Sequence, residues 1–204
     1  MDIKERIITE CNKLLMSVGA SSMTMDDVAH ACGISKRTLY ETFPDKRTLI
    51  SESLHYDHDA KNAEVKKIFE TADNCFDAMF QVYSRAKAMY QNTSVAFVND
   101  IKRLYPDIFE QYINSEKVTV NGLAGVLRKA QDEGLVIKRI NPEIAAYLFM
   151  VSMRELHNSN RGEKYGFEQT DLFEHVFISF LRGVATIKGI EMIDYLEKQN
   201  QQNQ

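Results

Sequence analysis

One stretch decides the fold, and it comprises residues 24–47, which read TMDDVAHACGISKRTLYETFPDKR. Its first half predicts a short helix. Thr24 begins this helix, because a threonine hydroxyl accepts the free backbone N–H of Asp27, and the Asp27 carboxylate can reach back to close a capping box. Gly33 ends it, since glycine readily takes the positive φ that the residue after a helix often needs. The same glycine predicts a sharp turn into a second helix.

The second helix has an expected length of about two turns. Ser35 is its expected N-cap, and Pro44 prevents the helix from continuing past Phe43. Leu39 and Phe43 are four residues apart, so they share one face, which must be buried. The remaining positions of this helix are therefore expected to face solvent or a binding partner.

The outer side of this helix is basic and rich in hydroxyl groups. Lys36 and Arg37 lie in its first turn, where a recognition helix presents side chains to base edges, and arginine can contact guanine with two hydrogen bonds. Asp45 predicts the cap of a further helix that starts with Lys46 and Arg47, where backbone N–H groups and an ammonium would converge on one phosphate. The pattern is typical of a DNA-binding helix-turn-helix. Its predicted DNA contacts are Thr24, Ser35, Lys36, Arg37, Thr38, Tyr40, Thr42 and Lys46.

The segment from Gly33 to Lys46, GISKRTLYETFPDK, resembles the signature of the TetR family, the tetracycline-repressor-like transcriptional regulators. The resemblance covers about residues 5–55 by motif and the rest only by length and helical pattern. It implies an all-helical, homodimeric repressor whose variable C-terminal domain binds a small effector and then releases DNA. Arg37 and the pair Glu41-Thr42 depart from the residues often seen there, so the operator sequence cannot be inferred. The alternative is an ordinary helical hairpin without a role in DNA binding. In that case the capping residues, the glycine turn and the proline would all have to occur together by chance.

Charge is segregated along the chain. The sequence has 25 Lys and Arg against 29 Asp and Glu, a net charge of −4. Residues 33–48 hold four cations and two carboxylates, a local net charge of +2, so the rest of the chain carries −6. An acidic body discourages indiscriminate binding to nucleic acid. Affinity is therefore expected to depend on a dimer that meets two half-sites.

Composition indicates a globular protein of the cytoplasm without a membrane partner. The 204 residues are 44% hydrophobic, which is enough for a sizeable core. The chain opens on a charged amphipathic pattern, without a signal-length apolar run and without a stretch long enough to span a bilayer. Its cysteines, Cys11, Cys32 and Cys75, are odd in number and lack Cys-x-x-Cys spacing, which argues against a disulfide framework or a cysteine zinc site. Each is interpreted as a small buried hydrophobe, and a redox role for one of them stays open.

Helical periodicity runs from end to end and predicts an all-α fold of about nine helices. We expect a three-helix DNA-binding domain over residues 1–46 and a helical effector-binding and dimerisation domain over residues 47–204. A long helix from Lys46 to about Glu70 would belong to both domains and would couple them. The expected helices after it cover 74–90, 93–104, 107–133, 141–158 and 170–188. The tail 197–204 has no apolar residue and is expected to be disordered.

The two final expected helices are strongly apolar. Leu172, Phe173, Val176, Phe177 and Phe180 cover more than one narrow stripe, so their helix is expected to meet both its own core and a partner. The family resemblance implies a homodimer through residues 141–158 and 171–188. Burial of these helices within one subunit is the alternative.

Aromatic and methionine residues between 76 and 153 suggest an apolar cavity for a small-molecule effector. The predicted effector contacts are Tyr83, Met89, Tyr90, Phe97, Arg103, Tyr105, Phe149 and Met153. The class of effector cannot be chosen from the sequence, and no cofactor is expected. The alternative is a regulator of the same DNA-binding type that is controlled by a protein partner, or an activator, without a small-molecule ligand.

Two other kinds of site receive little support. His55, His58 and Asp59 share one helix face, but a second ligand cluster is not evident, so a solvated face explains them better than a metal site. The sequence also lacks a phosphate loop, a nucleophile elbow, paired metal-binding histidines and a dinucleotide fingerprint, which argues against an enzyme.

Overall fold

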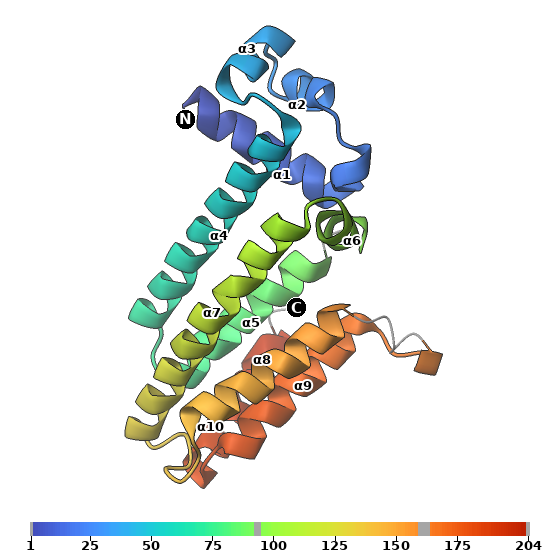
Figure 1. The fold of residues 1–204 in the computed structure, drawn as a ribbon. Coiled ribbons are helices and arrows are strands. Elements are labelled where there is room, and N and C mark those ends of the chain that lie inside the picture. Colours follow the sequence, from blue (N-terminus) through green and yellow to red (C-terminus); the bar gives the residue numbers. More distant parts are fainter. Residues whose placement is uncertain (1, 92–94, 159–163, 203–204) are drawn as a thin grey trace. The chain divides into compact units, whose positions relative to one another are not determined.

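The computed structural model describes residues 2–91, 95–158 and 164–202. Within these residues the chain forms ten α-helices, and the only strand-like pairing there is an isolated bridge between Val136 and Ala185. The prediction of an all-α fold is confirmed. Figure 1 shows the helices, and their labels are used below.

The chain divides into two compact units. Unit 1 comprises Met1–Val65 and Asn92–Asn114, and unit 2 comprises Lys66–Gln91 and Ser115–Gln204. Two helices belong to both units, α4 (Lys46–Thr71) and α7 (Pro106–Asp132). The functional boundary after residue 46 remains a prediction.

Unit 1 contains α1 (Ile3–Ser22), α2 (Met25–Ala31), α3 (Lys36–Thr42) and α6 (Val95–Leu104), with the adjoining parts of α4 and α7. Asp2 caps α1 in a capping box with Glu5. Gly19 kinks α1, with φ 80°, and one more turn follows it. The apolar stripe of α1 is buried against α2, α3 and α4, in a core that includes Ile7, Leu15 and Leu49.

A buried carboxylate joins α6 to the end of α1. Asp100 is only 6% exposed. It accepts hydrogen bonds from the backbone N–H of Ser21 at 2.7 Å and from the Ser21 hydroxyl at 2.5 Å. Arg103 donates to its other oxygen at 3.1 Å. The bonds from Ser21, followed by the nearby Arg103, lower the pKa of Asp100 from its ordinary value of 3.8.

This arrangement predicts that Asp100→Asn destabilises unit 1 by about 1–2 kcal/mol near neutral pH, because bonds to a charged acceptor are lost. A carboxylate whose pKa is lowered on folding stabilises the fold above its ordinary pKa, and this contribution disappears as the pH falls through the lowered pKa. The difference between wild type and variant should therefore shrink on acidification. Urea unfolding followed by circular dichroism at neutral pH and at about pH 3 measures it. A difference that grows at low pH would contradict the assignment.

Unit 2 contains α5 (Cys75–Gln91), α8 (Pro142–Asn158), α9 (Gln169–Val184) and α10 (Ile187–Gln202), with the adjoining parts of α4 and α7. Its core includes Phe76, Leu127 and Leu181, all fully or almost fully buried. Helices α8 and α9 pack against each other along unit 2 (Figure 1). Asn141 caps α8 by accepting the backbone N–H of Ile144 at 3.0 Å, and Pro142 occupies the first helical position, where proline is favoured.

The C-terminal helix corrects the sequence interpretation. One helix was expected up to about residue 188, followed by a disordered tail, but α9 ends at Val184 and α10 continues through Gln202. Ala185 is extended between them, with ψ 147°. Thr186 then begins α10, because its hydroxyl oxygen accepts the backbone N–H of Gly189 at 3.1 Å. Burial of Ile193 stabilises α10 against unit 2 although the residues that follow are polar.

The three cysteines are buried, as expected. Burial raises the pKa of the Cys11 thiol to about 11. Burial together with a hydrogen bond to Glu133 raises the pKa of Cys75 to about 12. Both thiols therefore stay protonated near neutral pH, which does not favour a redox role.

Candidate nucleic-acid interface

Helix α2 begins and ends as the sequence predicts. The Thr24 hydroxyl oxygen accepts the backbone N–H of Asp27 at 3.1 Å, and the Asp27 carboxylate accepts the backbone N–H of Thr24 at 2.8 Å. Gly33 follows α2 with φ +60°, a conformation that side-chain-bearing residues rarely adopt. The capping box and the positive-φ turn are confirmed. Together they fix the angle at which α3 leaves α2.

Two buried side chains anchor helix α3 to the core of unit 1. Leu39 and Phe43 are both 0% exposed and belong to the core of unit 1. Ser35 caps the helix, because its hydroxyl oxygen accepts the backbone N–H of Thr38 at 3.1 Å. The helix ends before Phe43, as predicted from Pro44. The burial of one face leaves the opposite face of α3 available to a partner.

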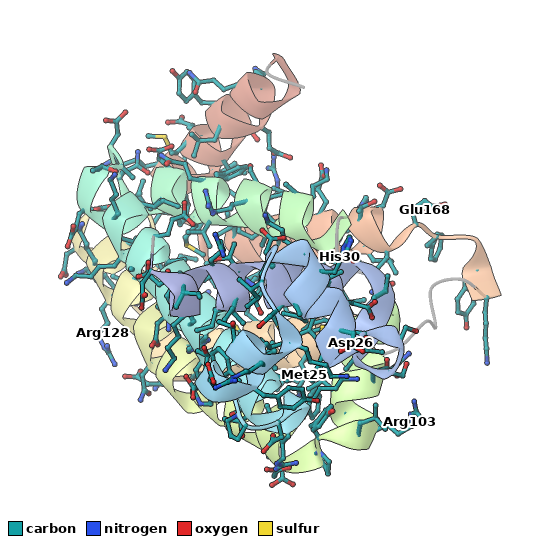
Figure 2. The ribbon with its side chains drawn as sticks, turned by 90° about the horizontal axis from the view of Figure 1, so that it is seen from above. Met25, Asp26, His30, Arg103, Arg128 and Glu168 are labelled. Carbon is teal, nitrogen blue, oxygen red and sulfur yellow. The ribbon has the colours of Figure 1, made fainter. Side chains whose placement is uncertain are left out.

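Both cations of α3 pair with carboxylates in unit 1. The Lys36 ammonium lies 2.8 Å and 3.0 Å from the two carboxylate oxygens of Asp26, which is labelled on α2 in Figure 2. Nε of Arg37 donates to Glu41 at 2.8 Å. The hydrogen bond that the Lys36 ammonium donates to Asp26 raises the pKa of Lys36. All four side chains are at least 60% exposed, so solvent screens these pairs and DNA can compete for the cations.

The hydroxyl groups of α3 also bond within unit 1. The Ser35 and Thr38 hydroxyl oxygens lie 2.8 Å apart, and the Thr42 hydroxyl donates to the Thr38 carbonyl at 3.0 Å. The Thr24 hydroxyl donates to the Asp27 carboxylate at 2.7 Å. Tyr40 is 43% exposed. A phosphate that binds these hydroxyl groups must therefore share or replace the hydrogen bonds that they make within unit 1.

Lys46 has a structural role that its sequence context does not reveal. Its ammonium donates to the carbonyl oxygens of Ala20, at 2.6 Å, and Met23. It therefore ties the start of α4 to the end of α1, where the carbonyls of a helix lack partners. Asp45 caps α4 by accepting the backbone N–H of Thr48 at 2.7 Å, as predicted. A phosphate contact from Lys46 remains a prediction, and it would use the third N–H of the ammonium, since the two carbonyls accept only two.

Arg47 follows Lys46 in the first turn of α4. Its guanidinium pairs with Asp107 at the start of α7 and lies 5.9 Å from the centre of the Tyr105 ring. The residues that sequence reasoning missed around α3 and α4 are therefore acidic partners. Glu41 could have been found from its i, i+4 spacing to Arg37. Asp26 and Asp107 could not, because their partners are brought close only by the fold.

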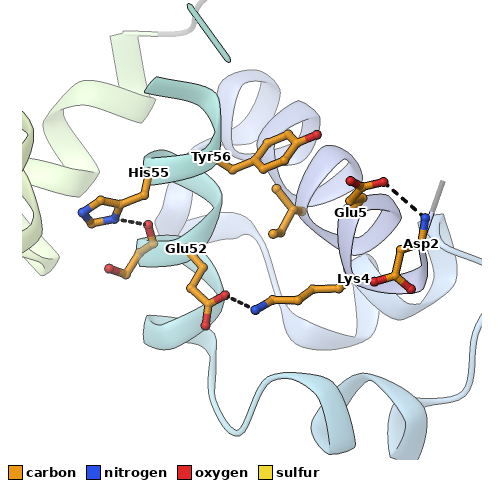
Figure 3. A pocket seen from close by; sticks show the side chains of 8 residues that line it. Asp2, Lys4, Glu5, Glu52, His55 and Tyr56 are labelled. Carbon is orange, nitrogen blue, oxygen red and sulfur yellow. Dashed lines mark hydrogen bonds and ion pairs between the residues drawn. The ribbon is translucent and has the colours of Figure 1, made fainter. Parts of the chain in front are cut away.

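A groove of about 550 Å³ lies in unit 1 between α1 and α4 (Figure 3). The Lys4 ammonium is 2.7 Å from the Glu52 carboxylate, and Nδ1 of His55 is 2.7 Å from the Ser51 carbonyl oxygen. The lining includes three carboxylates and one lysine, a balance that repels phosphate. The groove is therefore a poor extension of the DNA-facing surface.

The histidine cluster considered for a metal lies on α4. His55 lines the groove just described, and His58 and Asp59 follow on the same helix. Among the residues that the structure describes, no group of three or more His, Cys, Asp or Glu is arranged to hold a metal ion.

The predicted effector contacts fall in both units, and their role stays a prediction. Tyr83, Phe149 and Met153 pack in or against the core of unit 2. The Tyr83 ring stacks on Phe177 with ring centres 4.3 Å apart, and Phe149 lies 6.5 Å from the same ring. Tyr83 of α5 and Phe149 of α8 thus both approach the ring of Phe177 on α9.

The other predicted effector contacts fall elsewhere. Phe97 and Tyr105 pack against the core of unit 1, and Arg103 pairs with Asp100 at 3.1 Å. The side chains of Met89 and Tyr90 lie outside the described residues. Helix α6 packs with α1 in unit 1.

A polar group adjoins the aromatic cluster of unit 2 and was missed by the sequence analysis. The Tyr83 hydroxyl donates to Glu174 at 3.3 Å, and the Lys87 ammonium donates to the same carboxylate oxygen at 2.6 Å. Burial, followed by the Glu174 charge, raises the pKa of Tyr83. Lys87 is 21% exposed. The sequence offers no signal for this group, because Lys87 and Glu174 are 87 residues apart.

Comparison with known proteins relates the chain to bacterial regulators. Residues 7–52 match a family model described as "Bacterial regulatory proteins, tetR family". An uncharacterized HTH-type transcriptional regulator of Bacillus subtilis is 23% identical over 186 residues, which cover 89% of this chain and 95% of the relative.

Solved structures share the fold over most of the chain. A TetR family transcriptional regulator from Agrobacterium tumefaciens has a TM-score of 0.71 at 13% identity, covering 90% of this chain and 98% of that chain. A transcriptional regulator from Saccharomonospora viridis in complex with choline has a TM-score of 0.69 at 16% identity, with coverages of 90% and 97%. In the described part of this chain, no helix combines the length and apolar character needed to cross a bilayer.

Proposed function

This chain belongs to the TetR family of bacterial regulatory proteins, and we propose that it acts as a homodimeric repressor of transcription. It is a DNA-binding transcriptional regulator. Two chains would bind a palindromic operator in the cytoplasm, each with α3 in a major groove, and a small molecule would release them. The observation that carries this proposal is the capped α2–Gly33–α3 hairpin, whose inner face is buried and whose outer face presents Arg37, 87% exposed.

We propose a division of labour on α3. Lys36, Arg37 and Thr38 would approach base edges from the first turn, and Tyr40 would contact a phosphate. Thr24 and Ser35, the N-caps of α2 and α3, and Thr42, the last residue of α3, would donate hydroxyl or backbone N–H groups to phosphate oxygens. Lys46 would act mainly by holding α1 against α4, with a phosphate contact as the secondary role.

The proposed dimer surface is on α8 and α9. Ile144, Tyr147 and Leu148 of α8 are 59%, 54% and 57% exposed, and their i, i+3, i+4 spacing places them on one face. An exposed apolar stripe of this kind is typical of a protein interface. A second copy would cover it with the same stripe, as two-fold symmetry requires. Helix α10 follows these two helices, so they are not the last in the chain.

The proposed effector site is in unit 2, at the aromatic cluster around Phe177. Tyr83, Phe149 and Met153 would contact an apolar ligand, and the Glu174–Lys87 pair beside them would bind a polar group. The Saccharomonospora viridis regulator of this fold is in complex with choline, which supports the proposal that this chain binds a small molecule. Helices α4 and α7 belong to both units and would carry the response. Control by a protein partner, or activation, is the alternative, and a ligand that fails to release DNA would favour it.

Selection from a pool of random duplexes tests the DNA-binding proposal. The full-length chain should enrich an inverted repeat. On that duplex, Arg37→Ala should lose about 1–3 kcal/mol of discrimination at one base pair, because the two bonds to guanine are lost. Lys46→Ala should weaken binding to every duplex and lower the free energy of unfolding, because the bonds to Ala20 and Met23 are lost. Titrations of both variants against all single base-pair substitutions measure this, and equal losses on every duplex for both would contradict the assignment.

A further inference from the structure

We propose that Glu41 positions the Arg37 guanidinium for reading guanine and thereby sets the sequence specificity of α3. The inference rests on the proposed function, in which α3 enters the major groove. It gives an acidic residue a role in DNA recognition, beside the cations Lys36 and Arg37 of α3. Its effect on specific and on non-specific DNA is opposite in sign, which makes it testable.

The geometry of the pair supports a positioning role. Arg37 and Glu41 are four residues apart on α3, so both side chains lie on one face of the helix. Nε of Arg37 donates to Oε1 of Glu41 at 2.8 Å. An arginine has five N–H donors in a rigid plane, so a bond at Nε leaves the two terminal nitrogens to donate elsewhere. These nitrogens form the edge that can bind O6 and N7 of guanine together.

Positioning matters because the Arg37 side chain is otherwise unrestrained. It is 87% exposed, so few packing contacts limit its rotamers. A long arginine side chain loses much conformational entropy when it is ordered on binding. The bond to Glu41 orders part of the side chain before DNA arrives. The preference for guanine should therefore depend on Glu41 although its carboxylate makes no base contact.

The same carboxylate opposes binding to DNA of the wrong sequence. Non-specific binding depends on cations that neutralise phosphates, and Glu41 places a negative charge on the α3 surface beside Arg37. On a matching duplex, the bonds of Arg37 to guanine offset this repulsion. On other duplexes nothing offsets it. Glu41 therefore widens the gap between specific and non-specific affinity.

Asp26 provides a matched comparison within the same surface. It pairs with Lys36 at 2.8 Å and is 64% exposed, against 60% for Glu41, so Asp26→Asn removes one negative charge from a similarly exposed carboxylate. A lysine ammonium is a point charge without a planar pair of donors. Loss of Asp26 should therefore change charge without changing the reading of one base pair.

The experiment compares wild type, Glu41→Gln and Asp26→Asn as full-length chains. The probes are the duplex that wild type selects from a random pool, its single base-pair substitutions, and alternating poly(dA-dT) as the non-specific duplex. Glu41→Gln should lose roughly tenfold in discrimination at one G·C pair. Both variants should bind poly(dA-dT) about two- to threefold more tightly. Urea unfolding should be nearly unchanged for both, because exposed ion pairs contribute little to stability.

The outcomes distinguish failure of the positioning role of Glu41 from failure of the proposed DNA-binding function. Unchanged discrimination at every base pair in Glu41→Gln, on a duplex that wild type still selects, would overturn the positioning role alone. The positioning role would also be overturned if Asp26→Asn and Glu41→Gln lost discrimination at the same base pair to the same extent. If wild type selects no sequence, the proposed function fails and the inference fails with it. Loss confined to Glu41→Gln, at the pair that Arg37→Ala also affects, supports the proposal.

Discussion

Phe43→Ala should destabilise unit 1 by about 3–5 kcal/mol and abolish binding to the selected duplex. Phe43 is 0% exposed in the core beneath α3, and the Lys4 ammonium lies 5.7 Å from the centre of its ring. Removal of the ring leaves a cavity that the capped turn cannot close without moving α3. Because the free energy of unfolding of a whole domain is only about 5–15 kcal/mol, this loss would remove a large part of it.

Tyr40→Ala is the matched control for this substitution. It also removes an aromatic ring from α3. Because Tyr40 is 43% exposed, the free energy of unfolding of this variant should differ from that of wild type by less than about 1 kcal/mol. Circular dichroism during urea unfolding measures stability in both variants, since the chain has no tryptophan for fluorescence. A Phe43→Ala chain as stable as Tyr40→Ala would contradict the packing of α3 described above.

Gly189→Ala should cost unit 2 about 3 kcal/mol and detach α10. A Cβ atom at this position would overlap the Leu135 carbonyl oxygen and lie 3.1 Å from a carbon of the Phe76 ring. The carbonyl belongs to the backbone, which also accepts the N–H of Thr186 at 2.9 Å, so it cannot move without loss of that bond. The start of α10 would have to lift away from the unit 2 core. Hydrogen exchange along residues 187–202 should then be faster than in wild type.

Gly122→Ala provides the control for Gly189→Ala. Gly122 lies in α7 with no atom within 4 Å of a Cβ built there. Alanine favours the helix by up to about 1 kcal/mol over glycine, so this variant should be as stable as wild type or slightly more stable. Equal exchange rates in α10 for both variants would show that Gly189 is not a close contact.

The features that could be predicted from the sequence are mostly local. Thr24, Gly33 and Ser35 act on residues within three or four positions, so their caps and turn follow from general rules and are confirmed. The buried face of α3 follows from the spacing of Leu39 and Phe43. Local rules were therefore sufficient for the shape of the α2–α3 hairpin.

The features that could not be predicted depend on residues brought together by the fold. The carbonyls of Ala20 and Met23 that bind Lys46 carry no side-chain signal. Helix α10 was missed because the apolar pattern of α9 continues past Thr186 and hides its cap, and because burial against unit 2 outweighs a polar tail. The placement of Phe97 and Tyr105 in unit 1 likewise depends on how α6 packs with α1.

The central claim is that two copies of this chain read DNA through α3. Native mass spectrometry of the full-length chain with the duplex that it selects tests this claim most directly. The account predicts two chains on each duplex, with guanine-containing half-sites arranged as an inverted repeat. One chain per duplex, or failure to enrich any sequence from the random pool, would contradict it.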